Sequence, residues 1–446
     1  MNQDSFQRLI GLLIQFLDSE TVQLSEKARK DRTTIHYYSE IVRYWNKINF
    51  IYSYTIKAVN HSGNTTKTTK AIYFLIIYRK FWENATFEEI INDFQPFPKS
   101  LVPILSKKSL LQFYKKLQTF SWKKAFSNKS TIEKVSIDNA IPTFVLRRLK
   151  PYLQPDFILR NMEKLDSPEE LKTAIAIIEH QRNIKSDLKE RVKTYLIENK
   201  IPFSEDPIIN SMFLIPSRHL SQILQTQFYK RGNLLILDKG SAYIVKLLSP
   251  EKKGSFLDMC AAPGIKTILL SNFAYPQNKI FAVDFALTRV YEMKDMLKFY
   301  NTTNVSIMNG DSIDPPLRES TKYDKILLDA PCTGSGTFSS HPELKWRQNR
   351  SFLYQNVTLQ EKLLNSAVSL LKPGGILVYS TCSLYAEEGE LQVNHLLDTL
   401  LPMDLPEYFS DPYRINDTLP EGIGRLFPAL HGTKGFFVGK FKKKGA

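Results

Sequence analysis

From residue 254 to the C-terminus, short apolar runs alternate with segments that are long enough to form helices. The runs are residues 255–258, 279–284, 325–329 and 375–380, and apolar and β-branched side chains dominate them. Continuous apolar strands separated by helical segments are typical of a parallel sheet covered by helices on both faces. We therefore predict an α/β fold for this part of the chain.

The turn after the first run has the composition of a ligand-binding turn. It reads Cys260-Ala261-Ala262-Pro263-Gly264-Ile265-Lys266. Small residues let a ligand approach the backbone, and the free amides at the start of the next helix favour a negatively charged group. The turn has neither the GxGxxG nor the GxxxxGK[ST] pattern, which argues against a dinucleotide or a nucleoside triphosphate.

Acidic residues follow the later runs. Asp284 ends the second run about 20 residues past that turn, where an acid commonly binds ribose hydroxyls. Asp311 follows the next predicted strand and is placed to accept a hydrogen bond from an adenine amino group. Asp329 ends the third long run. Because ligands of open parallel sheets bind outside the carboxyl ends of the strands, these three acids are candidate site residues.

The chain has three cysteines, and Cys332 and Cys382 each closely follow an apolar run and lie in longer conspicuous strings. Cys332 and Cys382 are 50 residues apart, which is enough for one helical crossover between neighbouring parallel strands. We expect both thiols to face one cleft. Cys260 is interpreted as a small buried apolar side chain in its own turn. The chain has few cysteines and no CxxC pair, so we expect neither a disulfide framework nor a metal site. We expect a reducing, cytoplasmic setting.

The first third of the chain differs in character. Residues 1–93 have apolar positions at helical spacing and are predicted to be helical. Residues 1–150 contain 24 basic and 12 acidic side chains and so carry most of the net charge of +15, which suits a nucleic-acid partner. A basic surface that only aids solubility is the alternative. The apolar runs are far shorter than the roughly 20 residues that span a bilayer, so no membrane segment is expected.

Basic doublets alternate with aromatic side chains in residues 107–124. The doublets are Lys107-Lys108, Lys115-Lys116 and Lys123-Lys124, and the aromatic residues are Phe113, Tyr114, Phe120 and Trp122. Such interleaving indicates RNA contacts. The alternative is an amphipathic helix with aromatic side chains in the core and lysines in solvent.

Three strings carry a family resemblance. They are the turn at 260–266, the run Asp329-Ala330-Pro331-Cys332-Thr333-Gly334-Ser335-Gly336-Thr337, and Lys372-Pro373-Gly374-Gly375 with Tyr379-Ser380-Thr381-Cys382-Ser383. Together they closely resemble the Sun family of RNA cytosine-5 methyltransferases, over about residues 230–446. The resemblance implies a seven-stranded Rossmann-like domain that depends on S-adenosyl-L-methionine. It also implies that the turn holds the cofactor, while Asp284, Arg289, Asp311 and Asp329 line the cofactor or target pocket.

The order of the parts further resembles the RsmB-type members. It implies a helical, NusB-like RNA-binding domain at 1–140, a small α/β segment for RNA binding or linkage at 141–225, and the catalytic domain at 226–446. The resemblance makes Cys382 the nucleophile that attacks carbon 6 of cytosine and implicates Cys332 in product release. Ribosomal RNA is the expected substrate and transfer RNA the alternative. We expect a monomer without metal.

Two departures from the family pattern stand out. Ser339-Ser340 precede His341-Pro342 where the family often has paired arginines, which puts local phosphate contacts in doubt. The usual acidic-acidic-Asn-Glu run reads Glu387-Glu388-Gly389-Glu390, so the asparagine is missing.

Three other functions agree less well with the sequence. A DNA cytosine methyltransferase would use the thiol after Pro331 as nucleophile and leaves Cys382 unexplained. An RNA-binding assembly factor without catalysis does not require both cysteines and all four polar pocket residues. Methylation of a small molecule is disfavoured by the basic first third.

Overall fold

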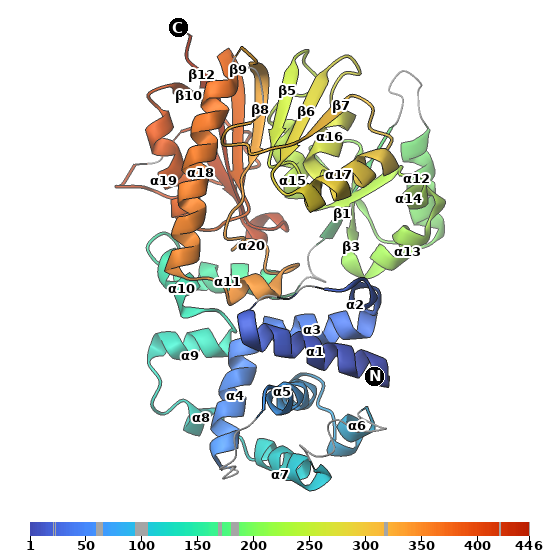
Figure 1. Ribbon diagram of the computed structural model, residues 1–446, viewed down its shortest axis with the longest axis vertical. Helices are drawn as coiled ribbons and strands as arrows, with labels where there is room; N and C mark the ends of the chain where they lie inside the picture. Colours follow the sequence, from blue (N-terminus) through green and yellow to red (C-terminus); the bar gives the residue numbers. More distant parts are fainter. Residues whose placement is uncertain are drawn as a thin grey trace. The chain divides into compact units, whose positions relative to one another are not determined.

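The computed structural model describes residues 1–20, 22, 24–58, 66–93, 106–167, 172–179, 187–315, 320–418 and 421–445. The chain forms two compact units (Figure 1). The first contains Met1–Lys150 and Ser340–Gln348, and the second contains Pro151–Ser339 and Asn349–Ala446. The two units are defined by compactness alone. The three functional segments predicted from the sequence, residues 1–140, 141–225 and 226–446, therefore remain a prediction.

The first unit is helical, which confirms the prediction for the described part of residues 1–93. Its helices are α1 (Gln3–Ser19), α2 (Glu26–Lys30), α3 (Arg32–Arg43), α4 (Trp45–Ala58), α5 (Lys67–Trp82), α6 (Phe87–Asn92), α7 (Lys107–Gln118), α8 (Trp122–Ala125), α9 (Thr131–Asp138) and α10 (Thr143–Leu149). Every residue of α5 from Ala71 to Tyr78 is buried, so this helix lies at the centre of the core. In α7, Phe113 and Tyr114 are buried, whereas Lys115 and Lys116 are exposed.

A segment from late in the sequence packs into this helical unit. Residues Ser340–Gln348 include the short 3-10 helix η2 (Pro342–Lys345). The fully buried Lys345 donates hydrogen bonds from Nζ to the carbonyl oxygens of Ala140 and Arg43, at 3.0 and 3.3 Å. Trp346 donates from Nε1 to the carbonyl oxygen of Val42. The sequence did not predict this packing, because local pattern carries no information about partners 200 to 300 residues away.

The second unit begins with helix α11 (Pro155–Asp166) and a small antiparallel sheet. Its strands are β1 (Lys172–Ile177), β2 (Ser204–Glu205), β3 (Met212–Pro216) and β4 (Leu234–Leu237), in the order β2-β3-β1-β4. The accompanying helices are α12 (Leu188–Glu198), η1 (Ser217–His219), α13 (Leu220–Gln225) and α14 (Gln227–Lys230). Val192 and Leu196 of α12 pack on Ile175 and Phe213 of this sheet.

The large sheet of the second unit confirms the predicted α/β fold. Its strands are β5 (Ser255–Met259), β6 (Lys279–Asp284), β7 (Val305–Asn309), β8 (Tyr323–Asp329), β9 (Leu371–Thr381), β10 (Leu400–Pro402), β11 (Ile423–Leu426) and β12 (Phe436–Lys443). Seven strands follow the order β10-β12-β9-β8-β5-β6-β7, and β11 pairs with β12. Strands β5 to β9 are parallel, while β10, β11 and β12 are antiparallel to their neighbours.

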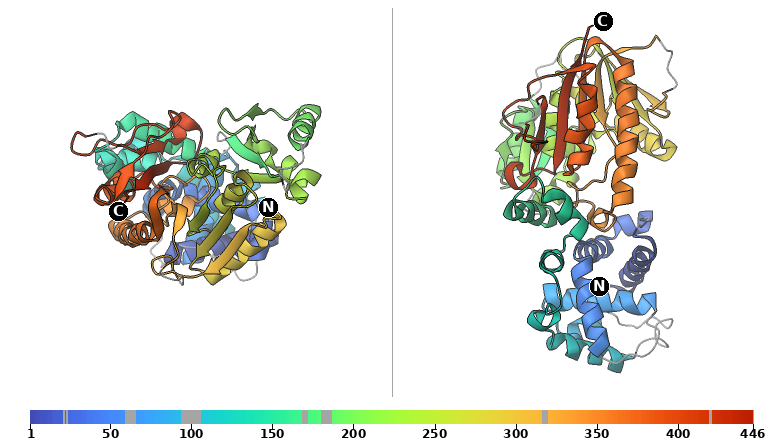
Figure 2. Two further views of the ribbon diagram at one scale, coloured as in Figure 1. Left: turned by 90° about the horizontal axis from the view of Figure 1, so that it is seen from above. Right: turned by 90° about the vertical axis from the view of Figure 1, so that its left-hand side faces the viewer.

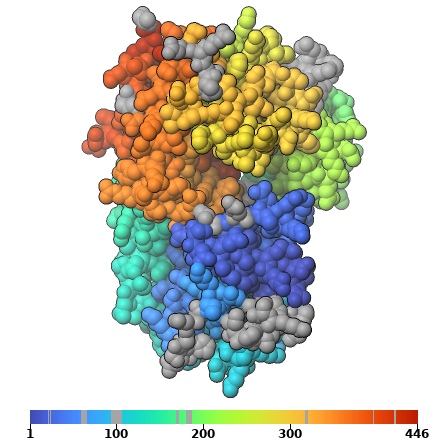
Figure 3. All heavy atoms as spheres, in the orientation of Figure 1, coloured from blue at the N-terminus to red at the C-terminus, as the bar shows by residue number. Residues whose placement is uncertain are grey.

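Helices cover both faces of this sheet, with a separate core on each. Its helices are α15 (Lys239–Lys246), α16 (Ile265–Phe273), α17 (Leu287–Phe299), α18 (Arg350–Leu370), η3 (Ala386–Glu388), α19 (Glu390–Val393), η4 (Asn394–Leu396) and α20 (Pro428–His431). One core joins α15, α16 and α17 to the strands, and the other joins α18 and α19 to the opposite face. Seen from the side, the long helix α18 runs beside β8 and β9 (Figure 2). Yellow and orange atoms, from the later part of the chain, cover much of this unit in the space-filling view (Figure 3).

The parallel strands bring the predicted site residues to one edge. Asp284 and Asp329 are the last residues of β6 and β8, and Cys382 directly follows β9. Asp329 is paired in register with Ser380 of β9. Residues distant in sequence therefore meet at the carboxyl ends of adjacent strands.

Candidate active site

The turn after β5 is fixed by contacts with the end of β6. The amide of Ala261 donates to the carbonyl oxygen of Val283 at 2.9 Å, and the amide of Ala262 donates to Oδ2 of Asp284 at 3.0 Å. Gly264 has a φ of 104° where α16 begins, and a Cβ there would meet Met293 at 3.1 Å. A side chain at this position would be strained, so glycine suits the turn.

Asp284 organises the neighbouring loop. This carboxylate is 2% exposed, and its Oδ1 accepts a hydrogen bond from the amide of Ala286 at 3.1 Å. Arg289 on α17 lies 3.6 Å from Oδ2 of Asp284 and also donates to the carbonyl oxygen of Ala262. Arg289 therefore joins the turn, the acid and α17.

Asp329 is held between a cation and a hydroxyl group. Lys266 Nζ lies 2.6 Å from its Oδ2, and Ser380 donates to its Oδ1 at 2.7 Å. Burial lowers the pKa of Lys266, but the charge of Asp329 and its hydrogen bond to Lys266 outweigh burial and raise the pKa above its usual value. Lys266 thus stays protonated and interacts electrostatically with the sulfur of Cys382.

A third acid, Asp258, lies beneath these residues and was not predicted as a site residue. Burial raises its pKa to about 7, and the negative charge of Asp329 adds to the effect. Thr267 donates to Asp258 at 2.6 Å. Asp258 ends the first apolar run, residues 255–258, as Asp284 and Asp329 end later runs, so the same signal was present in the sequence.

The thiols of Cys332 and Cys382 lie together, as their spacing predicted. Their sulfur atoms are 2.9 Å apart, and Cys332 is part of the loop after β8. The hydrogen bond with Cys382, together with burial, raises the pKa of Cys332 well above its usual value. Cys332 is therefore a protonated thiol at neutral pH, able to donate a hydrogen bond to the sulfur of Cys382.

Cys260 is different in character. Burial, together with the negative charges of Asp284 and Asp258, raises the pKa of its thiol well above the usual range. A thiol that stays protonated is a poor nucleophile.

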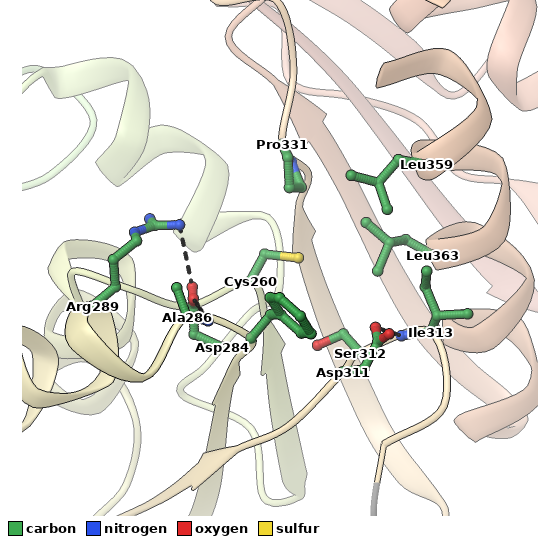
Figure 4. Close-up of a pocket in the computed structure, with 11 residues that line it drawn as sticks. Cys260, Asp284, Ala286, Arg289, Asp311, Ser312, Ile313, Pro331, Leu359 and Leu363 are labelled. Carbon is green, nitrogen blue, oxygen red and sulfur yellow. Dashed lines mark hydrogen bonds and ion pairs between the residues drawn. The ribbon is translucent and has the colours of Figure 1, made fainter. Parts of the chain in front are cut away.

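A cavity of about 360 Å³ opens beside the turn (Figure 4). It is lined by Cys260, Asp284, Phe285, Ala286, Arg289, Asp311, Ser312, Ile313, Pro331, Leu359 and Leu363. In the figure Asp284 and Arg289 lie on one side, and Leu359 and Leu363 of α18 lie on the other. Pro331, the residue before Cys332, also borders the space, so the cavity reaches the start of the thiol-bearing loop.

The structure separates the predicted site residues into two groups. Cys260, Asp284, Arg289 and Asp311 line the cavity. The remaining residues do not line it and form the turn and the polar cluster at its edge, namely Ala261, Ala262, Pro263, Gly264, Ile265, Lys266, Asp329, Cys332 and Cys382. The sequence did not predict the apolar lining residues. An apolar residue such as Phe285 or Leu363 has the same sequence pattern whether it lines a cavity or belongs to the core.

The lining suits a ligand with a flat apolar ring and hydroxyl groups. Phe285 is 74% exposed, which is unusual for a large apolar side chain, and it borders the cavity together with Ile313. The hydroxyl of Ser312 is buried and has no hydrogen-bond partner among the described residues. Asp284 and Asp311 supply acceptors. Pockets of this size that combine apolar walls with a few polar groups bind small organic ligands.

Over the described residues, no group of three or more histidine, cysteine or acidic side chains could hold a metal ion. The same part of the chain has no helix long and apolar enough to cross a bilayer.

The chain matches a known family over the part that carries this site. Residues 245–442 match the family described as "16S rRNA methyltransferase RsmB/F". This part of the chain, somewhat less than half of its length, is similar to the RsmB/F methyltransferases. The match includes the turn at 260–266, Asp329 and both thiols, so it confirms the family resemblance drawn from those motifs. The RsmB/F match begins after the first unit, and the NusB-like assignment of residues 1–140 stays a prediction.

A curated relative matches about half of the chain. The chain is 30% identical over 228 residues to the "Probable ribosomal RNA small subunit methyltransferase B" of Synechocystis sp., which covers 50% of each protein. The chain thus spans about half the length of the curated relatives it matches.

Solved structures share the fold over a wider range. The "Crystal Structure of PH0851" superposes with a TM-score of 0.76 at 22% identity and covers 98% of both chains. NSun6 from Pyrococcus horikoshii, solved with SFG, gives a TM-score of 0.59 at 18% identity and covers 69% of this chain and all of that one. These likenesses confirm the predicted methyltransferase fold.

Proposed function

We propose that this chain methylates carbon 5 of a cytosine in ribosomal RNA, with S-adenosyl-L-methionine as methyl donor. The observation that carries the proposal is the pair of thiols, 2.9 Å apart, at the carboxyl ends of adjacent parallel strands and beside a cavity of cofactor size. The names of the RsmB/F relatives favour small-subunit ribosomal RNA.

The cavity residues fit the cofactor. When bound, S-adenosyl-L-methionine supplies an electrophilic methyl group. Asp284 would accept hydrogen bonds from the ribose hydroxyls, and Phe285 and Ile313 would contact the adenine ring. Asp311 would accept from the adenine amino group, and the buried hydroxyl of Ser312 would gain a partner.

Cys382 would act on the other reactant. Carbon 5 of cytosine is a poor nucleophile, so its sulfur adds to carbon 6 and pushes an electron pair onto carbon 5, which then takes the methyl group. Asp329 hydrogen-bonds the pyrimidine edge, and the adjacent Lys266 cation offsets negative charge that develops on the ring. The target base must leave any stack to be reached by both groups.

Release would require the thiol of Cys332. The carbon 5 proton passes to solvent, its electron pair restores the ring double bond, and the sulfur–carbon 6 bond breaks with its electrons on Cys382. A hydrogen bond from the Cys332 thiol stabilises that leaving sulfur. The structure thus supports two different roles for two similar side chains.

The remaining parts would bind the RNA. The lysine-rich helical unit supplies positive charge for phosphate contacts, the small sheet region would bind RNA or act as a linker, and the chain would work as a monomer in the cytoplasm. Light scattering of the purified protein, alone and with RNA, tests the monomer.

Bisulfite sequencing of RNA tests the proposal. Cells with and without the gene are compared, alongside a strain complemented with Cys382→Ala. One cytosine of ribosomal RNA should lose its protection from bisulfite conversion in cells without the gene, and it should stay unprotected in the strain that carries Cys382→Ala. Loss of protection in a transfer RNA instead would show that transfer RNA is the substrate. No change in any RNA would favour an RNA-binding assembly factor without catalysis.

Asp284→Asn is expected to weaken binding of S-adenosyl-L-methionine about 10- to 100-fold, since hydrogen bonds to a charged group contribute about 1.5–3 kcal/mol. Isothermal titration calorimetry measures the change. Asp295→Asn, at an exposed position of α17, is the matched control and should bind normally. Equal affinities for both variants would contradict the assignment of Asp284.

Arg191→Glu with Arg231→Glu is expected to weaken RNA binding. These arginines line a separate cavity of about 290 Å³ in the small sheet region, together with Phe228, over which the Arg191 guanidinium lies at 5.8 Å. Cations beside an aromatic ring suit an unpaired nucleotide.

The salt dependence of RNA binding distinguishes direct contacts from misfolding. Loss of two phosphate contacts lowers the slope of log affinity against log salt by about 1.4 to 2. Lys252→Glu with Lys253→Glu is the control, because these exposed lysines precede β5 at the edge of the sheet opposite to the site. If the slope of log affinity against log salt is unchanged in the arginine variant, this cavity does not contact RNA.

A further inference from the structure

The residues on either side of Cys332 are held by one buried pair of side chains. The amide and the hydroxyl of Thr333 both donate to the carboxylate of Glu388, the amide at 2.9 Å. On the other side, Gln360 of α18 donates from Nε2 to the carbonyl oxygen of Pro331 at 2.8 Å. The same amide group donates to Glu388 at 3.0 Å. The Pro331–Thr333 backbone is therefore fixed before and after the thiol.

Glu388 is itself anchored to the strand that leads to the other thiol. Its carbonyl oxygen accepts hydrogen bonds from the hydroxyl groups of Tyr379 and Thr381, at 2.9 and 3.2 Å. Both residues belong to β9, and Thr381 directly precedes Cys382. Glu388 thus connects β9 through its backbone to the Cys332 loop through its side chain.

The network is closed to water. Glu388 and Gln360 are fully buried, and Thr333 is 1% exposed. Burial raises the pKa of Glu388, while the hydrogen bonds from Ser383, Thr333 and Gln360 oppose the rise. In such a site a lost donor or acceptor cannot be replaced by solvent, so each bond fixes geometry strongly.

We propose that Glu388, together with Gln360, is a positioning residue that holds the Cys332 thiol against the sulfur of Cys382 for release of the methylated base. This inference rests on the proposed function. Attack depends on Cys382 alone, which is placed by β9. Release needs the thiol of Cys332 within hydrogen-bond reach of the departing sulfur, and Cys332 lies on a loop whose position Glu388 sets.

The distinguishing readout is the covalent complex between protein and RNA. Glu388→Gln has nearly the same shape but replaces one acceptor by an amide donor, which faces the donors of Thr333 and Gln360. Turnover should fall about tenfold or more, as expected when a reacting group is displaced. A denaturing gel should show several times more RNA-linked protein than the wild type, because attack continues while release slows.

Two further variants keep the test independent of a folding defect. Thr333→Val removes only the hydroxyl donor at constant shape and should also accumulate adduct. Cys332→Ala should accumulate adduct too, and adding Glu388→Gln to it should change little, because both act on one step. Glu361→Gln, at an exposed position next to Gln360 on α18, is the matched control and should turn over normally.

The outcomes separate this inference from the proposed function. If the wild type forms 5-methylcytosine but Glu388→Gln and Thr333→Val lose turnover without accumulating adduct, the positioning role is wrong. Fully additive effects of Glu388→Gln and Cys332→Ala would also overturn it. If the wild type forms no 5-methylcytosine on any RNA, the proposed function itself fails.

Discussion

Cys382→Ala is expected to lower the rate of RNA methylation by at least ~1,000-fold, which corresponds to about 4 kcal/mol of transition-state stabilisation. Without the sulfur of Cys382 the assigned nucleophile is lost, the remaining Cys332 thiol is protonated, and carbon 5 stays a poor nucleophile. Transfer of a radioactive methyl group to RNA under single-turnover conditions measures the loss. Binding of S-adenosyl-L-methionine should be unchanged, because Cys382 does not line the cavity.

Cys332→Ala provides the contrast. It keeps the nucleophile, so we expect RNA to become linked to the protein and to be released slowly. If Cys332→Ala prevented all linkage while Cys382→Ala still formed it, the roles of the two thiols would be reversed. That result would match the chemistry of DNA cytosine methyltransferases.

Arg425→Met is expected to lower the free energy of unfolding by about 3–5 kcal/mol, because removing one partner leaves a buried charge uncompensated. Arg425 and Glu390 are both fully buried, and they form two hydrogen bonds of 2.8 and 2.6 Å. Arg425 also donates to the carbonyl oxygen of Ser383, the residue after Cys382, and its guanidinium lies 3.9 Å from the ring of Tyr413. Urea denaturation measures the loss.

The double variant Arg425→Met with Glu390→Met tests the cause of this loss. Removing both charges should restore at least about 1 kcal/mol relative to the single change. Arg414→Met, at an exposed position of the same unit, should be neutral and serves as control. A loss below about 1 kcal/mol for Arg425→Met would show that the ion pair contributes little.

The same arginine explains a departure from the family pattern. Gly389 stands where the family has asparagine, and a Cβ at this position would lie 2.6 Å from the ring of Phe437 and 3.0 Å from Nη2 of Arg425. Steric exclusion by Phe437 and the buried arginine therefore leaves room only for glycine. Nothing in the local sequence could have revealed this, since Arg425 is 36 residues away.

Several features followed from the sequence because they depend on local pattern. The apolar runs determined the strands of the parallel sheet, and the residues after each run determined which side chains reach its carboxyl edge. The positions of Asp284, Asp329 and both thiols were readable in this way. So was the pairing of Cys332 with Cys382, because a spacing of 50 residues matches one helical crossover.

Only the tertiary structure decided how those groups are tuned and supported. The Lys266–Asp329 ion pair, the raised pKa of Asp258 and the Glu388–Gln360 pair all join residues from different elements. The packing of Lys345 into the helical unit is of the same kind. A linear sequence records which side chains exist and their local periodicity. Burial and distance arise only when distant segments pack, and these two quantities set hydrogen bonding and charge in the site.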